Sequence, residues 1–96
     1  MKLLSVSKSD KSDKKYMAVF SDKDGRKKTT HFGAKGMDDY TITKDKEQRE
    51  RYRARHRKDL ESNDPTKPGY LSMYLLWGDS TSLQQNIKNY KKKFNL

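Results

Sequence analysis

The sequence predicts an α+β protein, with a small N-terminal antiparallel hairpin or three-stranded sheet followed by about three helices. Residues 15–21 and 27–32 are rich in strand-forming side chains, and they flank the turn-forming residues 22–25. Later in the chain, apolar residues recur at helical spacing. The dense apolar block 70–77 is then the expected centre of the core.

The composition limits how large that core can be. The chain has 96 residues, a length suited to one domain, and 30% of them are apolar, against roughly 45–50% in an average globular protein. A chain this short buries a small share of its surface. We therefore expect either a compact core with loose edges or a homodimer that pools apolar surface, and we favour the homodimer.

The first 14 residues differ in character from the rest. Residues 3–7 alternate as a short strand would, and residues 8–14 are a low-complexity run of Lys, Ser and Asp. We expect residues 1–14 to be a flexible basic segment with room for a short strand, and residues 15–96 to form a single α+β domain. In the hairpin, Gly25 suits a positive φ. Alternation in the return strand places Lys28, Thr30 and Phe32 on one face.

The middle of the chain predicts one long basic helix. Residues 33–40 form a loop, and the helix is expected to start near a cap at Thr43 or Lys44 and to run to about Glu61. Its apolar seam is thin and consists of Tyr52, His56 and Leu60. The proline-containing residues 62–69 end it.

Two further segments complete the predicted architecture. Gly78 follows the apolar block where a helix C-cap would stand. A last helix, capped by Asp79, Ser80 or Ser82, follows it. Its inward face is amphipathic and is formed by Leu83, Ile87, Tyr90 and Phe94.

The charge is the strongest functional signal in the sequence. The formal net charge is +10, and a field of this size on a small domain recruits polyanions. Residues 1–36 hold ten Lys and Arg against four Asp, residues 37–64 hold eight basic against eight acidic residues, and residues 65–96 hold five Lys against one Asp. The positive potential should therefore peak at the hairpin and at the C-terminal tail.

These observations predict a sequence-independent binder of double-stranded DNA that contacts the phosphate backbone. Arginine suits phosphate because its planar guanidinium donates two hydrogen bonds at once. No helix-turn-helix partner precedes the basic helix at the right distance, so base reading is not expected. The predicted nucleic-acid-binding residues are Lys15, Arg26, Lys27, Lys28, Lys35, Arg49, Arg51, Arg53, Arg55, Arg57, Lys58, Lys88, Lys91 and Lys92.

Each of these signals also has a structural interpretation. The arginines could form local pairs on a solvated helix, as Glu47 and Arg51 would, and lysines on an edge strand also prevent aggregation. The Gly33–Gly36 segment is more typical of a turn than of a phosphate cradle. Aromatic residues of the apolar block could stack bases, but a core or a dimer interface is favoured. We assign the dimer interface to Tyr70, Met73, Tyr74 and Trp77.

Other functional classes find little support. The chain has no cysteine, which excludes disulfides and thiolate metal sites, and it has two histidines. A nuclease-like set could be drawn from Asp38, Asp39, Glu47 and a histidine, but nothing in the pattern holds these groups together. We expect no enzyme activity, no metal, no cofactor and no small-molecule substrate. No stretch approaches the ~20 apolar residues of a membrane span, so no membrane partner is expected.

Several blocks of the sequence resemble a family of small basic proteins of unassigned function encoded by giant nucleocytoplasmic DNA viruses, with marseillevirus-like and algal virus members. The resemblance covers roughly residues 15–95 and is carried by residues 30–36, 39–45, 51–57, 69–72, 75–77 and 82–90. It implies a virion or a viral factory in the host cytoplasm, and a role in genome packaging or condensation. Without it, a nucleocytoplasmic location is expected. The alternative function is that of a structural virion protein that binds acidic protein partners.

Overall fold

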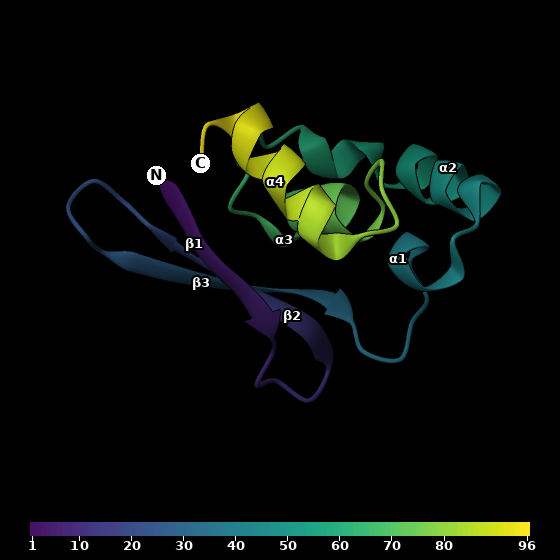
Figure 1. Cartoon of the computed structure of the whole chain (residues 1–96), viewed down its shortest axis with the longest axis horizontal. Helices are drawn as coiled ribbons and strands as arrows, with labels where there is room; N and C mark the ends of the chain where they lie inside the picture. The colour runs from purple at the N-terminus through teal and green to yellow at the C-terminus, as the bar shows by residue number, and fades with distance from the viewer.

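The computed structural model describes all 96 residues and confirms the α+β class. Three antiparallel strands come first, in the order β1 (Lys2–Lys8), β2 (Lys14–Ser21) and β3 (Lys27–Ala34). The helical part contains four α-helices, all on one side of the sheet, and leaves the other face uncovered (Figure 1). These helices are α1 (Tyr40–Thr43), α2 (Lys46–Arg55), α3 (Pro68–Leu71) and α4 (Leu83–Phe94).

Strand β1 belongs to the sheet along its whole length. It pairs with β2 from Lys2 opposite Ser21 to Lys8 opposite Tyr16, and a β-bulge at Leu4 shifts the register. Because of the extra residue, Leu3 and Val6 both face the core, although simple alternation would separate them. Leu3 is 3% exposed whereas Leu4 is 48% exposed. The first eight residues are thus anchored in the sheet by pairing and burial.

The β2–β3 hairpin follows the predicted pattern. Its turn is closed by Asp22, whose side chain accepts hydrogen bonds from the backbone N–H groups of Asp24 and Arg26, both at 2.9 Å. Gly25 has a φ of +82°, which glycine adopts without strain. On the core side, Thr30 and Phe32 are buried as alternation predicts.

The basic helix differs from its prediction at both ends. Helix α2 starts at Lys46 because the Asp45 side chain caps it, accepting from the N–H groups of Glu47 and Gln48. It ends at Arg55, and the 3₁₀ turn η1 (Arg57–Leu60) follows. The tighter turn brings Leu60 against the core, where its carbonyl accepts a hydrogen bond from the Tyr70 hydroxyl at 2.8 Å.

The apolar block is helical and lies at the centre of the core. Helix α3 continues into a π-helical turn, η2 (Ser72–Leu76), which the Trp77 N–H closes by donating to the Ser72 carbonyl at 3.0 Å. Leu71 and Leu75 are fully buried, in one cluster with Phe20 and Phe32 of the sheet. Apolar side chains surround the axis of this helical segment, and such a helix is expected in the core of a protein.

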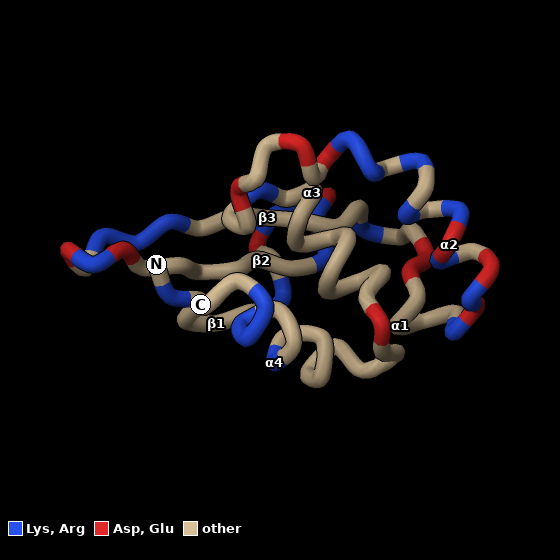
Figure 2. The backbone as a smooth tube through the Cα atoms, turned by 90° about the horizontal axis from the view of Figure 1, so that it is seen from above, with Lys and Arg blue, Asp and Glu red and all other residues tan.

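Helix α4 closes the structure over this block. Ser82 caps it by accepting from the Gln85 N–H, and Tyr90 is 1% exposed. Burial raises the pKa of the Tyr90 hydroxyl, which donates to the Pro65 carbonyl. The end of the helix brings the C-terminus beside the N-terminus (Figure 2), where the Leu3 N–H donates to the Leu96 carbonyl at 3.3 Å.

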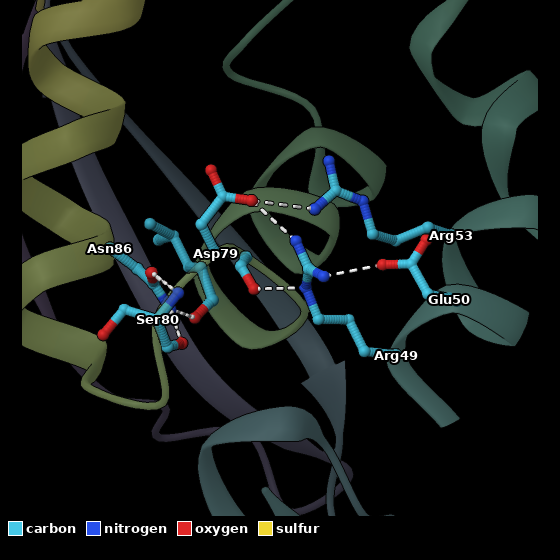
Figure 3. Close-up of polar contacts among 8 residues, drawn as sticks. Arg49, Glu50, Arg53, Asp79, Ser80 and Asn86 are labelled. Carbon is cyan, nitrogen blue, oxygen red and sulfur yellow. Dashed lines mark hydrogen bonds and ion pairs between the residues drawn. The ribbon is translucent and has the colours of Figure 1, made fainter. Parts of the chain in front are cut away.

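Asn86 fastens α4 to the loop that follows η2. Its side-chain amide donates to the carbonyls of Leu75 at 3.0 Å and Ser80 at 2.8 Å, and its side-chain oxygen accepts from the Ser80 N–H at 3.0 Å (Figure 3). The residue is 1% exposed. One buried side chain thus satisfies three backbone groups that would otherwise have no partner.

We expect Asn86→Ala to lower the free energy of unfolding by about 3 kcal/mol, because the buried backbone groups lose their only side-chain partner. Asn89→Ala is the matched control on the same helix. Asn89 is exposed and bonds only Gln85, so its loss should cost less than about 0.5 kcal/mol. Urea unfolding followed by circular dichroism measures both. Equal losses for the two variants would contradict the role given to Asn86.

Candidate nucleic-acid interface

Cations from the two ends of the chain meet at one end of the molecule. Lys2 lies opposite Ser21 on β2, and Ser21 lies opposite Lys27 on β3. The end of α4 reaches the same place through the bond between Leu3 and Leu96. In Figure 2 both termini lie beside the hairpin, which extends beyond them. We call this end of the molecule the basic end and define it as Lys2, Arg26, Lys27, Lys28, Lys91 and Lys92. Alternation along the strands places Lys2 and Lys27 on the uncovered face of the sheet and Lys28 on the face that carries the helices.

The residues of the basic end are exposed, and none of them is in an ion pair. Lys28 alone has a side-chain partner, the Thr66 hydroxyl at 2.8 Å. Thr66 in turn donates twice to Asp64, and these bonds lower the pKa of the Asp64 carboxyl. Nearer the tip, Asp22 and Asp24 offset Lys23. The uncompensated charge therefore lies just behind the tip of the hairpin.

Lys15 was predicted to contact nucleic acid, but it is a structural residue. Its Nζ lies 2.6 Å from Oδ2 of Asp39, and the two side chains are 11% and 2% exposed. Asp39 also caps α1 by accepting from the Thr41 N–H and hydroxyl. The prediction for Lys15 is wrong because strand β2 places the lysine against a buried carboxylate that needs a counter-charge.

Two arginines of α2 are also occupied within the chain (Figure 3). Arg49 donates from Nε to the Gly78 carbonyl at 2.7 Å and pairs with Glu50 and Asp79, both at 2.6 Å. Arg53 shares Asp79 at 3.3 Å. Their side chains are 15% and 30% exposed. Arg49 therefore docks α2 onto the loop after η2, and its predicted phosphate contact is not available.

The other predicted cations remain exposed, and all except Lys88, which lies one turn before Lys91 on α4, lie apart from the basic end. α2 lies at the far end of the sheet from the hairpin tip (Figure 1). Acidic residues interleave with its cations, Glu47 and Glu50 within α2 and Asp59 in η1, which weakens the local field. The exposed residues are Lys35 in the turn after β3, Arg51 and Arg55 on α2, Arg57 and Lys58 on η1, and Lys88 on α4.

The predicted dimer interface is instead the core of a single chain. Tyr70 and Trp77 are each 6% exposed and Met73 is 2% exposed. Tyr74 is half-buried, with its ring against Tyr90 and Phe94 of the same chain. The assignment to a dimer interface is wrong because other parts of the same chain cover these side chains: α4 packs on Tyr70 and Tyr74, and Tyr52 of α2 stacks on Trp77. The core interpretation of the aromatic residues holds.

Of the residues considered for catalysis, Asp38 and His56 line one cleft, whereas Asp39, Glu47 and His31 do not line it. Asp38 is exposed, Asp39 is paired with Lys15, and His31 bonds the Ser9 hydroxyl at 2.7 Å. No group of three or more His, Asp or Glu side chains is arranged to hold a metal ion. No helix combines the length and apolar character needed to cross a membrane.

Comparison with known protein families identifies the family of this chain. Residues 4–56 match the model of DUF5754, a family of unknown function. The chain belongs to this family. The DUF5754 match contains the hairpin and all of α2, but it ends before the apolar block and before the lysines of α4. No curated protein and no solved structure matches the chain.

The Lys15–Asp39 pair leads to a stability prediction. Lys15→Met should lower the free energy of unfolding by roughly 3–5 kcal/mol, because it leaves a buried carboxylate without its counter-charge. Lys14→Met, one residue earlier in β2, removes a cation that has no ion-pair partner and should have little effect. Guanidinium unfolding measures both variants.

A second substitution separates lost charge from lost packing. Asp39→Asn in the Lys15→Met background should recover part of the stability, since it removes the unpaired charge and asparagine still caps a helix. No recovery would show that the lysine acts through packing instead of charge.

Proposed function

We propose that the protein binds double-stranded DNA without sequence preference, through phosphate contacts made by the basic end. The observation that carries the proposal is the gathering of exposed cations without ion-pair partners, from β1, the hairpin and the end of α4, at one end of the molecule. Lysine and arginine that are already paired inside a protein cannot also neutralise phosphate. None of the cations of the basic end is in an ion pair, and Lys28 alone donates to a side chain, the neutral hydroxyl of Thr66.

The electrostatics support a phosphate ligand. A DNA duplex carries one negative charge per about 1.7 Å of its axis, and each neutralised phosphate releases condensed counterions. A formal net charge of +10 on 96 residues also speeds the encounter with a polyanion. Binding of this kind is strong at low salt and weakens steeply as salt rises.

The shape of the basic end fits a duplex groove. The β2–β3 hairpin is a two-stranded ribbon that extends beyond the helices (Figure 1), and the major groove admits such a ribbon. Lys27 and Lys28 follow its turn, and Lys2 flanks it on β1. Lysine contacts phosphate as a point charge and carries little sequence information.

The proposed setting is a virion or viral factory, where such a protein would coat or condense a large DNA genome. This part of the proposal rests on the resemblance to basic proteins of giant DNA viruses. One protein that coats many sites needs little discrimination between sequences, which agrees with contacts confined to the DNA backbone.

The test is a titration of labelled, unrelated DNA duplexes with the Arg26→Glu/Lys27→Glu variant at several salt concentrations. The unaltered protein should bind all duplexes equally, with log K falling linearly against log salt. The variant should bind more weakly, and its slope should be smaller by about two, at roughly 0.9 per lost phosphate contact. Fluorescence anisotropy gives both quantities.

Lys44→Glu/Lys46→Glu is the matched control, because it changes the net charge equally and alters exposed lysines beside α2. It should keep most of the affinity and the full slope. Equal losses in both variants would show that net charge acts without a defined surface. Absence of DNA binding by the unaltered protein at low salt would sink the proposal, and acidic protein partners would then be sought by co-purification.

A further inference from the structure

A cleft lies at the opposite end of the sheet from the basic end. Its volume is about 570 Å³, within the range of roughly 300–1,000 Å³ typical of ligand sites. The end of β3 and the turn after it form one wall, with Gly33 and Gly36, and α2 with η1 forms the other. Lys14 and Ala34, which pair at this end of the sheet, both line it.

A column of three aromatic rings ends in this cleft. Trp77 stacks on Tyr52 with ring centroids 4.4 Å apart and planes 9° apart, and Tyr52 stacks on His56 at 4.1 Å and 23°. All three rings line the cleft. Trp77 is 6% exposed, whereas the His56 side chain is 41% exposed. Since one face of His56 lies on Tyr52, its other face is free to extend the stack.

The cleft also presents cations and hydrogen-bonding groups. Lys14 and Arg55 line it and take part in no ion pair. Two carboxylates also line it: Asp59, which the His56 ring engages at 3.2 Å, and Asp38, which is exposed and in no ion pair. The side-chain oxygen of Gln48 accepts from the Thr43 hydroxyl at 2.8 Å, which leaves the amide N–H groups of Gln48 free to donate.

We propose that this cleft binds one unstacked nucleotide, with its base on the outer face of His56 and its phosphate held by Lys14 and Arg55. A planar base extends an aromatic stack whatever its identity. A phosphate accepts charge-assisted hydrogen bonds from both cations. The Gln48 amide can donate to the base edge. The nucleotide can come free from solution or from the end of a nucleic-acid strand.

This site is separate from the surface proposed to bind duplex DNA, and the two can fail independently. The Arg26→Glu/Lys27→Glu variant should lose duplex affinity and keep nucleotide binding. A variant of the cleft should do the reverse. The duplex titration therefore tests only the basic end, and the AMP titration tests only the cleft.

The experiment uses the fluorescence of Trp77, the single tryptophan of the chain, which lines the cleft at the buried end of the column. AMP should change this emission saturably and bind more tightly than adenosine, which lacks the phosphate, or ribose 5-phosphate, which lacks the base. Equal affinity for AMP and ribose 5-phosphate would overturn the proposal, as would no saturable change with AMP or with a short single strand.

Two arginines of α2 provide the sharpest comparison. Arg55 lines the cleft, whereas Arg51, one turn earlier and also exposed, does not. Arg55→Ala should weaken AMP binding by about tenfold, the loss expected for one charge-assisted hydrogen bond, and should leave adenosine unaffected. Arg51→Ala should change neither. Equal effects of the two substitutions on AMP would refute a localised site.

The stacking contact is tested at His56. His56→Phe keeps a flat ring and should retain AMP binding, whereas His56→Ala should weaken it about tenfold. Circular dichroism checks that both variants fold, and if the alanine variant does not, the Arg55 comparison stands alone. A short single-stranded oligonucleotide that competes with AMP points to a strand end as the source, and lack of competition points to a free nucleotide.

Discussion

The apolar segment Tyr70–Trp77 has to supply much of the core, because a chain with 30% apolar residues has little else to bury. Burying each large side chain contributes about 1.5–3 kcal/mol. Six side chains of this segment are fully or nearly fully buried, namely Tyr70, Leu71, Met73, Leu75, Leu76 and Trp77. The positions of the charged surfaces follow from it. Helix α4 packs on η2 and carries the C-terminus to β1, and Tyr52 of α2 stacks on Trp77.

Two ion pairs, one buried and one at the surface, also hold the elements around this small core together. Lys15 and Asp39 join β2 to the start of α1, and Arg49 joins α2 to Gly78 and Asp79. Both connections are made by cations that, in the sequence, are indistinguishable from their exposed neighbours. A strongly basic composition therefore overstates the charge that is available to a partner, since part of it holds the elements together.

The two proposed surfaces suit different anions. The side chains of the basic end are exposed to solvent along a hairpin, as contact with an extended polyanion requires. The cleft is concave, and it offers an aromatic face with two cations nearby, which suits one nucleotide. The DUF5754 match includes the hairpin and the α2 wall of the cleft, whereas Lys91 and Lys92 lie outside it.

The sequence by itself determined the local features, which depend on residues close together in the chain. The hairpin and its Gly25 turn, the buried Thr30 and Phe32, the apolar block and the amphipathic α4 were all predictable, because alternation, turn chemistry and helical spacing act over a few residues. The cap of α2 was misjudged by one or two positions, since Thr43, Lys44 and Asp45 are adjacent candidates and only the structure shows which side chain caps.

Only the tertiary structure decided which charges are free and which surfaces form. Lys15 and Asp39 are 24 positions apart, and Arg49 and Asp79 are 30 apart, so no local pattern could pair them. Lys2 joined the basic end because a bulge and strand pairing set its place, and the cleft arose where β3 meets α2. Burial and long-range pairing depend on how the elements pack, and that packing is settled by the whole chain at once.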